Sequence, residues 1–174
     1  MPVVQPRIYS RHLQALAHLR TDAPNAFDYL DDHERLTAHM TSSSPMMAGG
    51  SMAFTFDEAR GRSVGSVIRM TGNVLGVALT VQEEITERAP PVRKAWETIG
   101  SPHLLVIGHY RMGFELAPAQ DSCTLRVFID YSLPTGFAWA LGLIAARTYA
   151  RWCVDAMARD AEKHSGIAAT QKRL

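Results

Sequence analysis

The sequence contains few residues that would cross-link the chain or attract charged partners. Its only two cysteines, Cys123 and Cys153, are spaced for neither a C-x-x-C motif nor a zinc site. Free cysteine is among the most often buried residue types, so both are interpreted as reduced, buried side chains of a cytoplasmic protein. The formal net charge of +1 lacks the basic excess typical of nucleic-acid-binding domains, so no nucleic-acid partner is expected.

Long apolar runs are also absent. The longest strongly apolar stretch covers ten residues, 137–146, whereas a membrane-spanning helix needs about 20. Residues 1–20 show none of the apolar core of a signal peptide. The sequence therefore predicts no stable membrane insertion and favours a cytoplasmic location.

The motifs of familiar catalytic and metal sites are missing as well. The seven histidines are scattered and no His-Glu-x-x-His motif occurs, so no metal site is expected. The sequence contains neither a P-loop nor a Gly-x-Ser-x-Gly nucleophile elbow. Nothing in it indicates a cofactor.

Apolar side chains are plentiful instead. Hydrophobic residues make up 47% of the chain and charged residues 20%, which excludes general disorder. A chain of 174 residues can bury about 70% of its unfolded surface without a metal or disulfide. We expect one domain over residues 1–174, with no internal repeat and with its core at about 12–163.

The apolar pattern changes period along the chain. Residues 12–21 alternate, which indicates a strand, with a short helix as the alternative. Asp22 and Pro24 are typical of a helix start, and short helices are predicted over 24–30 and 32–39. Residues 41–50 are predicted to form a loop. The further predicted strands cover residues 51–57, 63–71, 77–87, 92–99, 104–116 and 123–132.

The last long segment is helical in pattern. From 136 to 163, apolar residues recur at steps of three and four, whereas the tail 165–174 has no periodicity and is predicted to be frayed. Strands in an unbroken run pair mostly antiparallel, because parallel crossovers need a dozen or more residues. The predicted fold class is α+β, with a curved antiparallel sheet of six to seven strands wrapped around a long C-terminal helix and two short helices after the first strand.

Three segments carry a family resemblance. Residues 21–32 follow the first predicted strand, residues 87–93 contain Pro90-Pro91, and residues 131–134 lead through Leu133-Pro134 into the long helix. In this order they resemble motifs of the START/Bet v1-like (SRPBCC) superfamily, in its polyketide cyclase/dehydrase and lipid-transport group. The resemblance covers residues 12–163 and implies the helix-grip fold. The connection at 59–62 is short where plant members carry a glycine-rich loop, so no plant-type specificity is inferred.

The resemblance implies a cavity between the sheet and the helix, which would bind a hydrophobic small molecule such as a lipid, a quinone or a polyketide-like aromatic. The alternation of side chains along the strands and the periodicity of the helix identify the residues that would line this cavity. A filled core would produce the same pattern. The predicted ligand-binding residues are Met70, Leu79, Trp96, Tyr110, Met112, Val127, Ile129, Leu141, Ala145 and Tyr149.

One carboxylate shares an apolar face. Glu83 is in phase with Leu79, Val81 and Ile85, so a regular strand would point it inward. Buried carboxylates serve as general acids and bases, which makes Glu83 and Tyr110 the candidate catalytic residues. The alternatives are a bulge at 82–84 that turns the side chain outward, or a position beyond the edge of the core.

Methionines gather near the loop at 41–50. Met46, Met47 and Met52 are predicted to form a flexible gate at the cavity mouth, because methionine adapts to varied apolar shapes. A surface loop without such a role is the alternative.

Three functions follow from these observations. The first is binding or carriage of a hydrophobic small molecule. The second is a polyketide cyclase/dehydratase-type enzyme that uses an inward carboxylate. The third is a protein-interaction module with a filled core. The sequence leaves both a monomer and a homodimer open.

Overall fold

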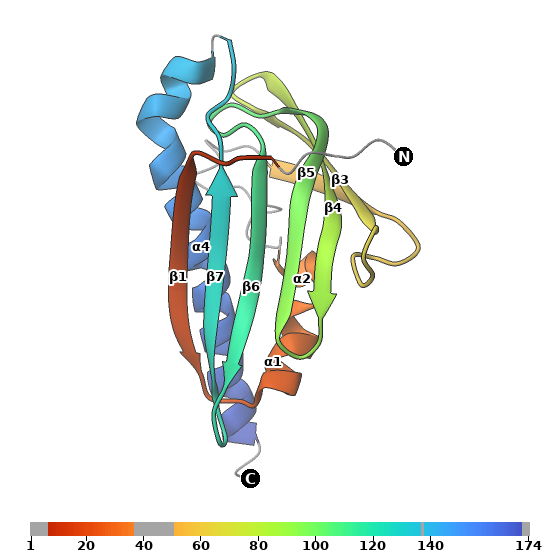
Figure 1. Ribbon diagram of the computed structural model, residues 1–174, viewed down its shortest axis with the longest axis vertical. Coiled ribbons are helices and arrows are strands. Elements are labelled where there is room, and N and C mark those ends of the chain that lie inside the picture. The colour runs from red at the N-terminus through yellow and green to blue at the C-terminus, as the bar shows by residue number, and fades with distance from the viewer. Residues whose placement is uncertain (1–6, 37–50, 137, 172–174) are drawn as a thin grey trace.

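The computed structural model describes residues 7–36, 51–136 and 138–171. Seven strands form one sheet in the order β1-β7-β6-β5-β4-β3-β2, and every neighbouring pair is antiparallel. The long helix α4 runs along one face of this sheet, and the short helices lie beside it (Figure 1). The elements are β1 (Arg11–Leu19), α1 (Ala23–Leu30), α2 (His33–Leu36), β2 (Ser51–Phe56), β3 (Val67–Val74), β4 (Val77–Ala89), β5 (Arg93–His103), β6 (Tyr110–Pro118), β7 (Cys123–Tyr131) and α4 (Ala138–Gln171).

The predicted architecture is confirmed. The start of α1 shows how the local sequence determines one of its elements. Asp22 caps α1, because its Oδ1 accepts a hydrogen bond from the backbone N–H of Asn25 at 2.9 Å. Pro24 occupies the first turn of α1, where a missing N–H costs nothing. The segment before this cap is strand β1, not a short helix.

The prediction of a strand over 104–116 is wrong in its first half. Strand β6 begins only at Tyr110, and residues 104–109 form a loop between β5 and β6. This loop packs closely on the segment that leads into α4: the Gly108 N–H donates to the Ser132 carbonyl at 2.9 Å, and a Cβ at Gly108 would lie 2.7 Å from the Leu133 carbonyl oxygen. The apolar residues before Gly108 therefore reflect burial in a loop and not strand pairing.

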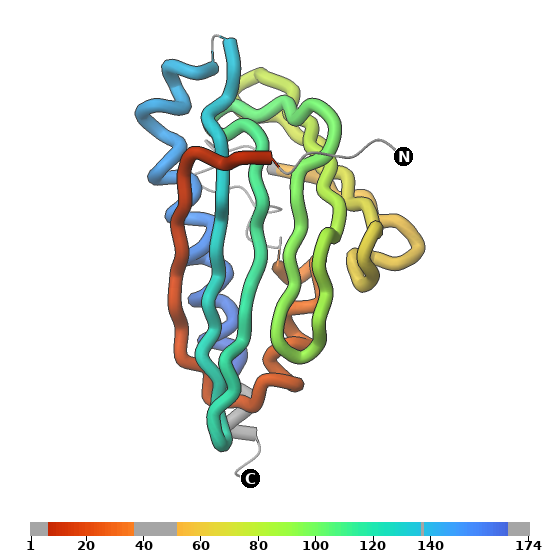
Figure 2. Tube along the Cα trace, in the orientation of Figure 1, coloured from red at the N-terminus to blue at the C-terminus, as the bar shows by residue number. Residues whose placement is uncertain are grey.

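The prediction of a frayed tail over 165–174 is wrong for its described part, since α4 continues to Gln171; residues 172–174 lie outside the described residues. Ser165 stabilises this extension, because its hydroxyl donates to the Glu162 carbonyl at 2.8 Å and accepts from the Arg20 N–H at 3.3 Å. At 34 residues, α4 is about 50 Å long. Its first turns extend past the end of β1 (Figure 2).

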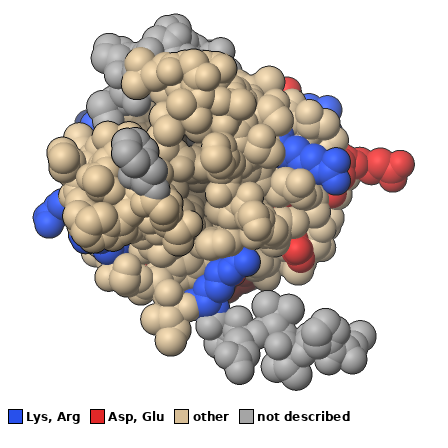
Figure 3. Space-filling view, turned by 90° about the horizontal axis from the view of Figure 1, so that it is seen from above, with Lys and Arg blue, Asp and Glu red and all other residues tan. Residues whose placement is uncertain are grey.

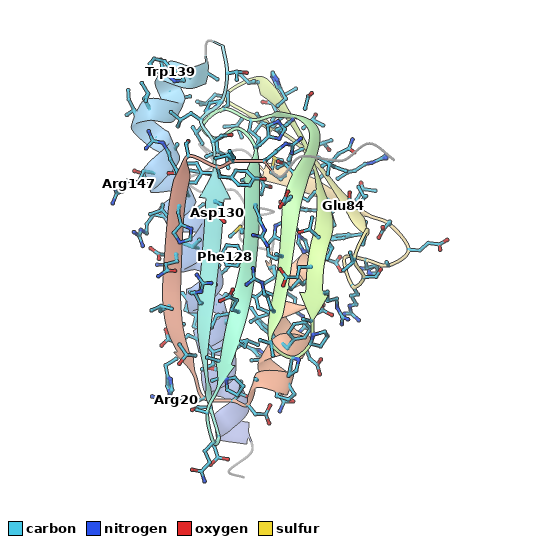
Figure 4. All side chains as sticks on the ribbon, in the orientation of Figure 1. Arg20, Glu84, Phe128, Asp130, Trp139 and Arg147 are labelled. Carbon is cyan, nitrogen blue, oxygen red and sulfur yellow. The ribbon has the colours of Figure 1, made fainter. Side chains whose placement is uncertain are left out.

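The face of the sheet away from α4 is charged around a single aromatic ring. Phe128 is buried there, and the guanidinium groups of Arg93, Arg111 and Arg126 lie 5.4–5.8 Å from its ring centroid. Glu115 forms ion pairs with Arg93 and Arg126. Figure 4 shows Phe128 and Asp130 on this outer face. Apolar groups are otherwise concentrated on the concave inner face, which therefore carries the candidate site.

Candidate functional site

An apolar cavity lies between the inner face of the sheet and α4, in two adjoining compartments. The first has a volume of about 60 Å³ and the second, between the β5–β6 loop and α4, about 160 Å³. Both are lined by Leu79, Leu104, Ile107 and Tyr149. The first is also lined by Leu36, Met52, Met70, Val81, Glu83, Trp96, Tyr110, Met112, Ile129, Cys153 and Met157. Glu83 is thus the one carboxylate among the described residues that line it.

Most of the residues that were predicted to line the cavity do line one of its two compartments. The first compartment contains Met70, Leu79, Trp96, Tyr110, Met112, Ile129 and Tyr149, and Ala145 lines the second. Val127 is fully buried in the core but does not line either compartment.

The structure contradicts the prediction for Leu141, whose side chain is 45% exposed. Leu141 lies one turn before Ala145 and shares its helix face. Leu141 belongs to the first turn of α4, and the first turns of this helix extend past the end of the sheet (Figure 1). Helical periodicity identifies a face but does not show where the sheet beneath it ends.

The predicted methionine gate is described only in part. Met52 on β2 is 4% exposed and lines the first compartment. Met46 and Met47 lie outside the described residues, so their role as a gate stays a prediction.

Glu83 points inward and is 3% exposed. Strand β4 pairs with β3 without interruption from Val77 to Glu84, which keeps Glu83 in phase with Val81. The register with β5 shifts on both sides of Glu83: extra residues lie in β5 opposite Thr80 and Gln82, and one extra residue, Thr86, lies in β4. Neither a bulge at 82–84 nor a position beyond the core edge therefore applies.

Two buried side chains contact the Glu83 carboxylate. The Tyr110 hydroxyl donates a hydrogen bond to Oε1, and His33 Nε2 lies 3.3 Å from Oε2. His33 is itself buried and packs edge-on against Trp96, with ring centroids 4.8 Å apart. A Cβ at Gly61 would lie 3.2 Å from the His33 Cβ, so glycine at this turn leaves the histidine room. We call His33, Glu83 and Tyr110 the polar cluster.

Sequence reasoning missed His33. It lies 50 residues from Glu83 on a four-residue helix, so no local spacing links the two side chains. It also missed the buried Lys94, whose Nζ lies 3.0 Å from Asp31 Oδ1. The sequence did contain a signal for Lys94. It lies two residues before Trp96, and residues two apart on a strand point to the same side, so Lys94 points inward like Trp96.

The Tyr110 phenol and the Cys153 thiol are held in their protonated forms. Burial, together with the neighbouring Glu83, raises the pKa of the Tyr110 hydroxyl well above 10.0. Burial also raises the pKa of the Cys153 thiol to about 12, so it is not a thiolate nucleophile at neutral pH. In the described part of the chain, no group of three or more His, Cys, Asp or Glu side chains is arranged to hold a metal ion. The first compartment thus offers the Glu83 carboxylate, which His33 contacts, and the phenols of Tyr110 and Tyr149 in apolar surroundings.

No helix in the described ranges combines the length and apolar character needed to cross a bilayer. No protein-family model matches the sequence, and no curated protein matches it significantly.

Several solved structures share the fold. A protein of Thermus thermophilus, TTHA0849, is 12% identical over 91% of this chain and 99% of its own, with a TM-score of 0.65. The Zhui aromatase/cyclase from a Streptomyces species is 12% identical over 90% of this chain and 93% of its own, also with a TM-score of 0.65. Norcoclaurine synthase from Thalictrum flavum is 16% identical over 88% of this chain and 84% of its own, with a TM-score of 0.60. These likenesses, together with the sheet order and the long helix α4, show that the chain has the helix-grip fold.

Proposed function

We propose that the protein binds or carries a hydrophobic small molecule in the cavity, with an apolar group between the β5–β6 loop and α4 and a polar group against the polar cluster. A lipid, a quinone or a polyketide-like aromatic has this combination of parts. The observation that carries the proposal is a buried, hydrogen-bonded carboxylate in the wall of an otherwise apolar cavity. Ligand sites are mostly apolar with a few convergent polar groups.

The volumes limit what fits without rearrangement. An apolar cavity of about 150 Å³ holds a benzene molecule, whereas drug-sized ligands occupy about 300–1,000 Å³. The compartment of about 160 Å³ therefore accepts one small ring, and the adjoining compartment of about 60 Å³ leaves room for part of a second fused ring. A larger ligand requires the β5–β6 loop to move away from α4. The cavity also argues against a protein-interaction module with a filled core.

The two buried cysteines are free thiols, which supports the expected cytoplasmic location.

Binding is tested with naphthol and naphthalene, which differ only in a hydroxyl group. Wild-type protein should bind naphthol about tenfold more tightly or better, because a hydrogen bond to a charged group contributes about 1.5–3 kcal/mol. Glu83→Gln should remove most of this preference. Fluorescence titration measures both affinities, and native mass spectrometry identifies any copurified apolar molecule.

The control uses two phenylalanine substitutions one helical turn apart. Ala145→Phe fills the second compartment and should abolish naphthol binding, whereas Leu141→Phe adds its ring at an exposed position and should leave binding unchanged. Equal affinities in the two variants would overturn the proposed site.

A second candidate function is an enzyme of the polyketide cyclase/dehydratase type, and the inward Glu83 in contact with Tyr110 favours it. Glu83 would remove a proton from a carbon next to a carbonyl group. His33 and Tyr110 would hold the carboxylate in place, and the apolar walls would exclude water.

Nitrobenzisoxazole tests this chemistry, because its ring opens to a coloured product when a base removes its ring-carbon proton. Glu83→Gln should abolish protein-catalysed ring opening. Glu84→Gln changes the adjacent residue, which occupies the opposite phase of β4, and should leave the rate unchanged (Figure 4). If Glu83→Gln and Glu84→Gln opened the ring at the same rate, Glu83 would not be the base. The binding proposal would be unaffected by that result.

A further inference from the structure

Exposed apolar side chains gather at one end of the molecule. They come from the β3–β4 turn and from the first turns of α4, where Ile144 is 82% exposed and Trp139 52% exposed. Figure 3 looks onto this end, whose centre shows few charged side chains. We call this surface the apolar end; its exposed residues are Leu75, Val77, Trp139, Leu141, Leu143 and Ile144.

The start of α4 is apolar on every side. Residues 138–146 contain no charged side chain, and a helix of that kind is normally surrounded by apolar material. Here one side is buried through Ala146, while Leu143 and Ile144 face outward. A single exposed leucine needs no explanation, but a helical segment exposing this much apolar surface indicates a binding surface.

Leu75 adds an independent observation. It is the residue at the tip of the β3–β4 turn, it is 76% exposed, and its φ is +52°. That left-handed conformation favours glycine or asparagine and is unfavourable for a bulky residue. The leucine contributes little to packing within the chain, so its side chain is available to a partner outside it.

The charge of this end is uniformly basic. Residues 72–81, 98–110, 133–136 and 138–154, which build it, contain Arg147 and Arg151 but no aspartate or glutamate. Both arginines are exposed and lie further along α4 than Trp139; Figure 4 shows this for Arg147. An apolar tip followed by basic groups matches the order of layers in a membrane, with acyl chains beneath anionic headgroups.

We propose that the apolar end docks on an anionic phospholipid bilayer, with Leu75, Trp139 and Ile144 entering the boundary between headgroups and acyl chains. Tryptophan is enriched at this depth because its ring is apolar and its N–H is polar. The second compartment lies directly behind this surface, between Val74 and Ala145, so the cavity adjoins the lipid when the protein is docked. A second copy of the chain is less suitable, because the segments of this end carry Arg147 and Arg151 without an aspartate or glutamate, so two copies would bring like charges together.

Cosedimentation with vesicles tests the proposal. Wild-type protein should bind phosphatidylcholine vesicles that contain phosphatidylserine, and it should bind less well without phosphatidylserine or at high salt. The Leu75→Asn/Ile144→Gln double variant should bind at least about tenfold more weakly, because two apolar side chains that would be buried in the bilayer are replaced by polar ones. Asparagine suits the conformation of residue 75, so the turn should remain intact.

Leu16→Gln is the matched control. It removes a leucine that is 64% exposed on β1, away from the apolar end, and should bind vesicles like wild type. Equal binding of the double variant and this control would overturn the proposal, as would the absence of wild-type binding to either vesicle. A wild-type dimer in sedimentation velocity that Ile144→Gln dissociates would also overturn it, in favour of a second copy. Naphthol binding without vesicles should be the same in all these variants, so loss of docking is distinguishable from loss of the cavity.

Discussion

Asp31, at the end of α1, holds three segments together through one carboxylate. Arg88 of β4 donates to it with two nitrogens, at 3.1 Å to Oδ1 and 2.8 Å to Oδ2. Lys94 of β5 is fully buried and donates to the Asp31 carbonyl at 2.8 Å as well as pairing with Oδ1. Burial lowers the pKa of the Lys94 ammonium, and the pairing with Asp31 opposes this effect. The turn between α1 and α2, which precedes His33, therefore depends on a compensated buried charge.

Asp31→Asn should destabilise the protein by about 3–5 kcal/mol, because it leaves the Lys94 charge buried without its counterion. Urea unfolding measures this loss. The double variant Asp31→Asn/Lys94→Met removes both charges and should recover much of it. A single variant as stable as wild type would show that the ammonium is not buried in solution.

The same carboxylate predicts a pH dependence. Burial alone would raise the pKa of Asp31, but hydrogen bonds from Arg88 and Lys94 outweigh it and lower the pKa below 3.8. The unfolded chain then binds this proton more readily than the folded one. The contribution of Asp31 is therefore complete above about pH 3.8 and is lost as the pH falls through the lower folded pKa. Urea unfolding below pH 5 should show a shallower decline in Asp31→Asn; a parallel decline would contradict the assignment.

Glycine at position 113 is required by close packing. A Cβ there would lie 2.5 Å from the Lys94 carbonyl oxygen and 2.9 Å from Phe128 Cζ. Gly113→Ala should therefore destabilise the protein by about 1–3 kcal/mol in urea unfolding. Gly166 in α4 has no neighbour within 4 Å of such a Cβ, so Gly166→Ala should stabilise the helix by about 0.5–1 kcal/mol. Similar effects at both positions would contradict the packing argument.

At the scale of elements, α4 approaches the sheet through small side chains. Ala146, Ala150, Ala158 and Ala161 are at most 5% exposed and recur along one helix face. Alanine at these positions lets the helix lie close to the sheet, while larger residues such as Met157 line the cavity.

Ala150→Leu should therefore destabilise the protein by about 1–3 kcal/mol through overpacking. Ala140→Leu makes the same change at an exposed position of the same helix and should shift the thermal midpoint only slightly. Thermal unfolding followed by circular dichroism compares the two. A neutral Ala150→Leu would mean that α4 is free to move away from the sheet.

The elements could be predicted where a local pattern determines them. Alternation identified the strands because one side of each is buried, and the Asp22 cap identified the start of α1. The start of β6 could not be predicted, because residues 104–107 of the β5–β6 loop are all apolar, and a continuous apolar run fits a buried strand as well as a buried loop. The end of α4 depends on the Ser165 contacts with Glu162 and Arg20, the second of which is long-range in sequence.

At the scale of the whole molecule, the residues of the cavity walls could be predicted from the alternation of side chains along each strand. The contacts between side chains from different elements could not. Glu83 was identifiable because it interrupts an apolar face. Its partner His33 was not, because only the packing of α2 on the sheet brings the two together. Leu141 shows the converse, since its helix face is correct but the sheet ends before reaching it.

The three tryptophans occupy three different environments. Trp96 is 2% exposed and lines the cavity beside His33, Trp139 stands at the apolar end, and Trp152 is half-buried on α4. Indole fluorescence shifts to shorter wavelength when water leaves the ring. The molecule therefore has separate intrinsic optical reporters, with Trp96 sensitive to cavity occupancy and Trp139 sensitive to lipid contact, and single-tryptophan variants can read the two events independently.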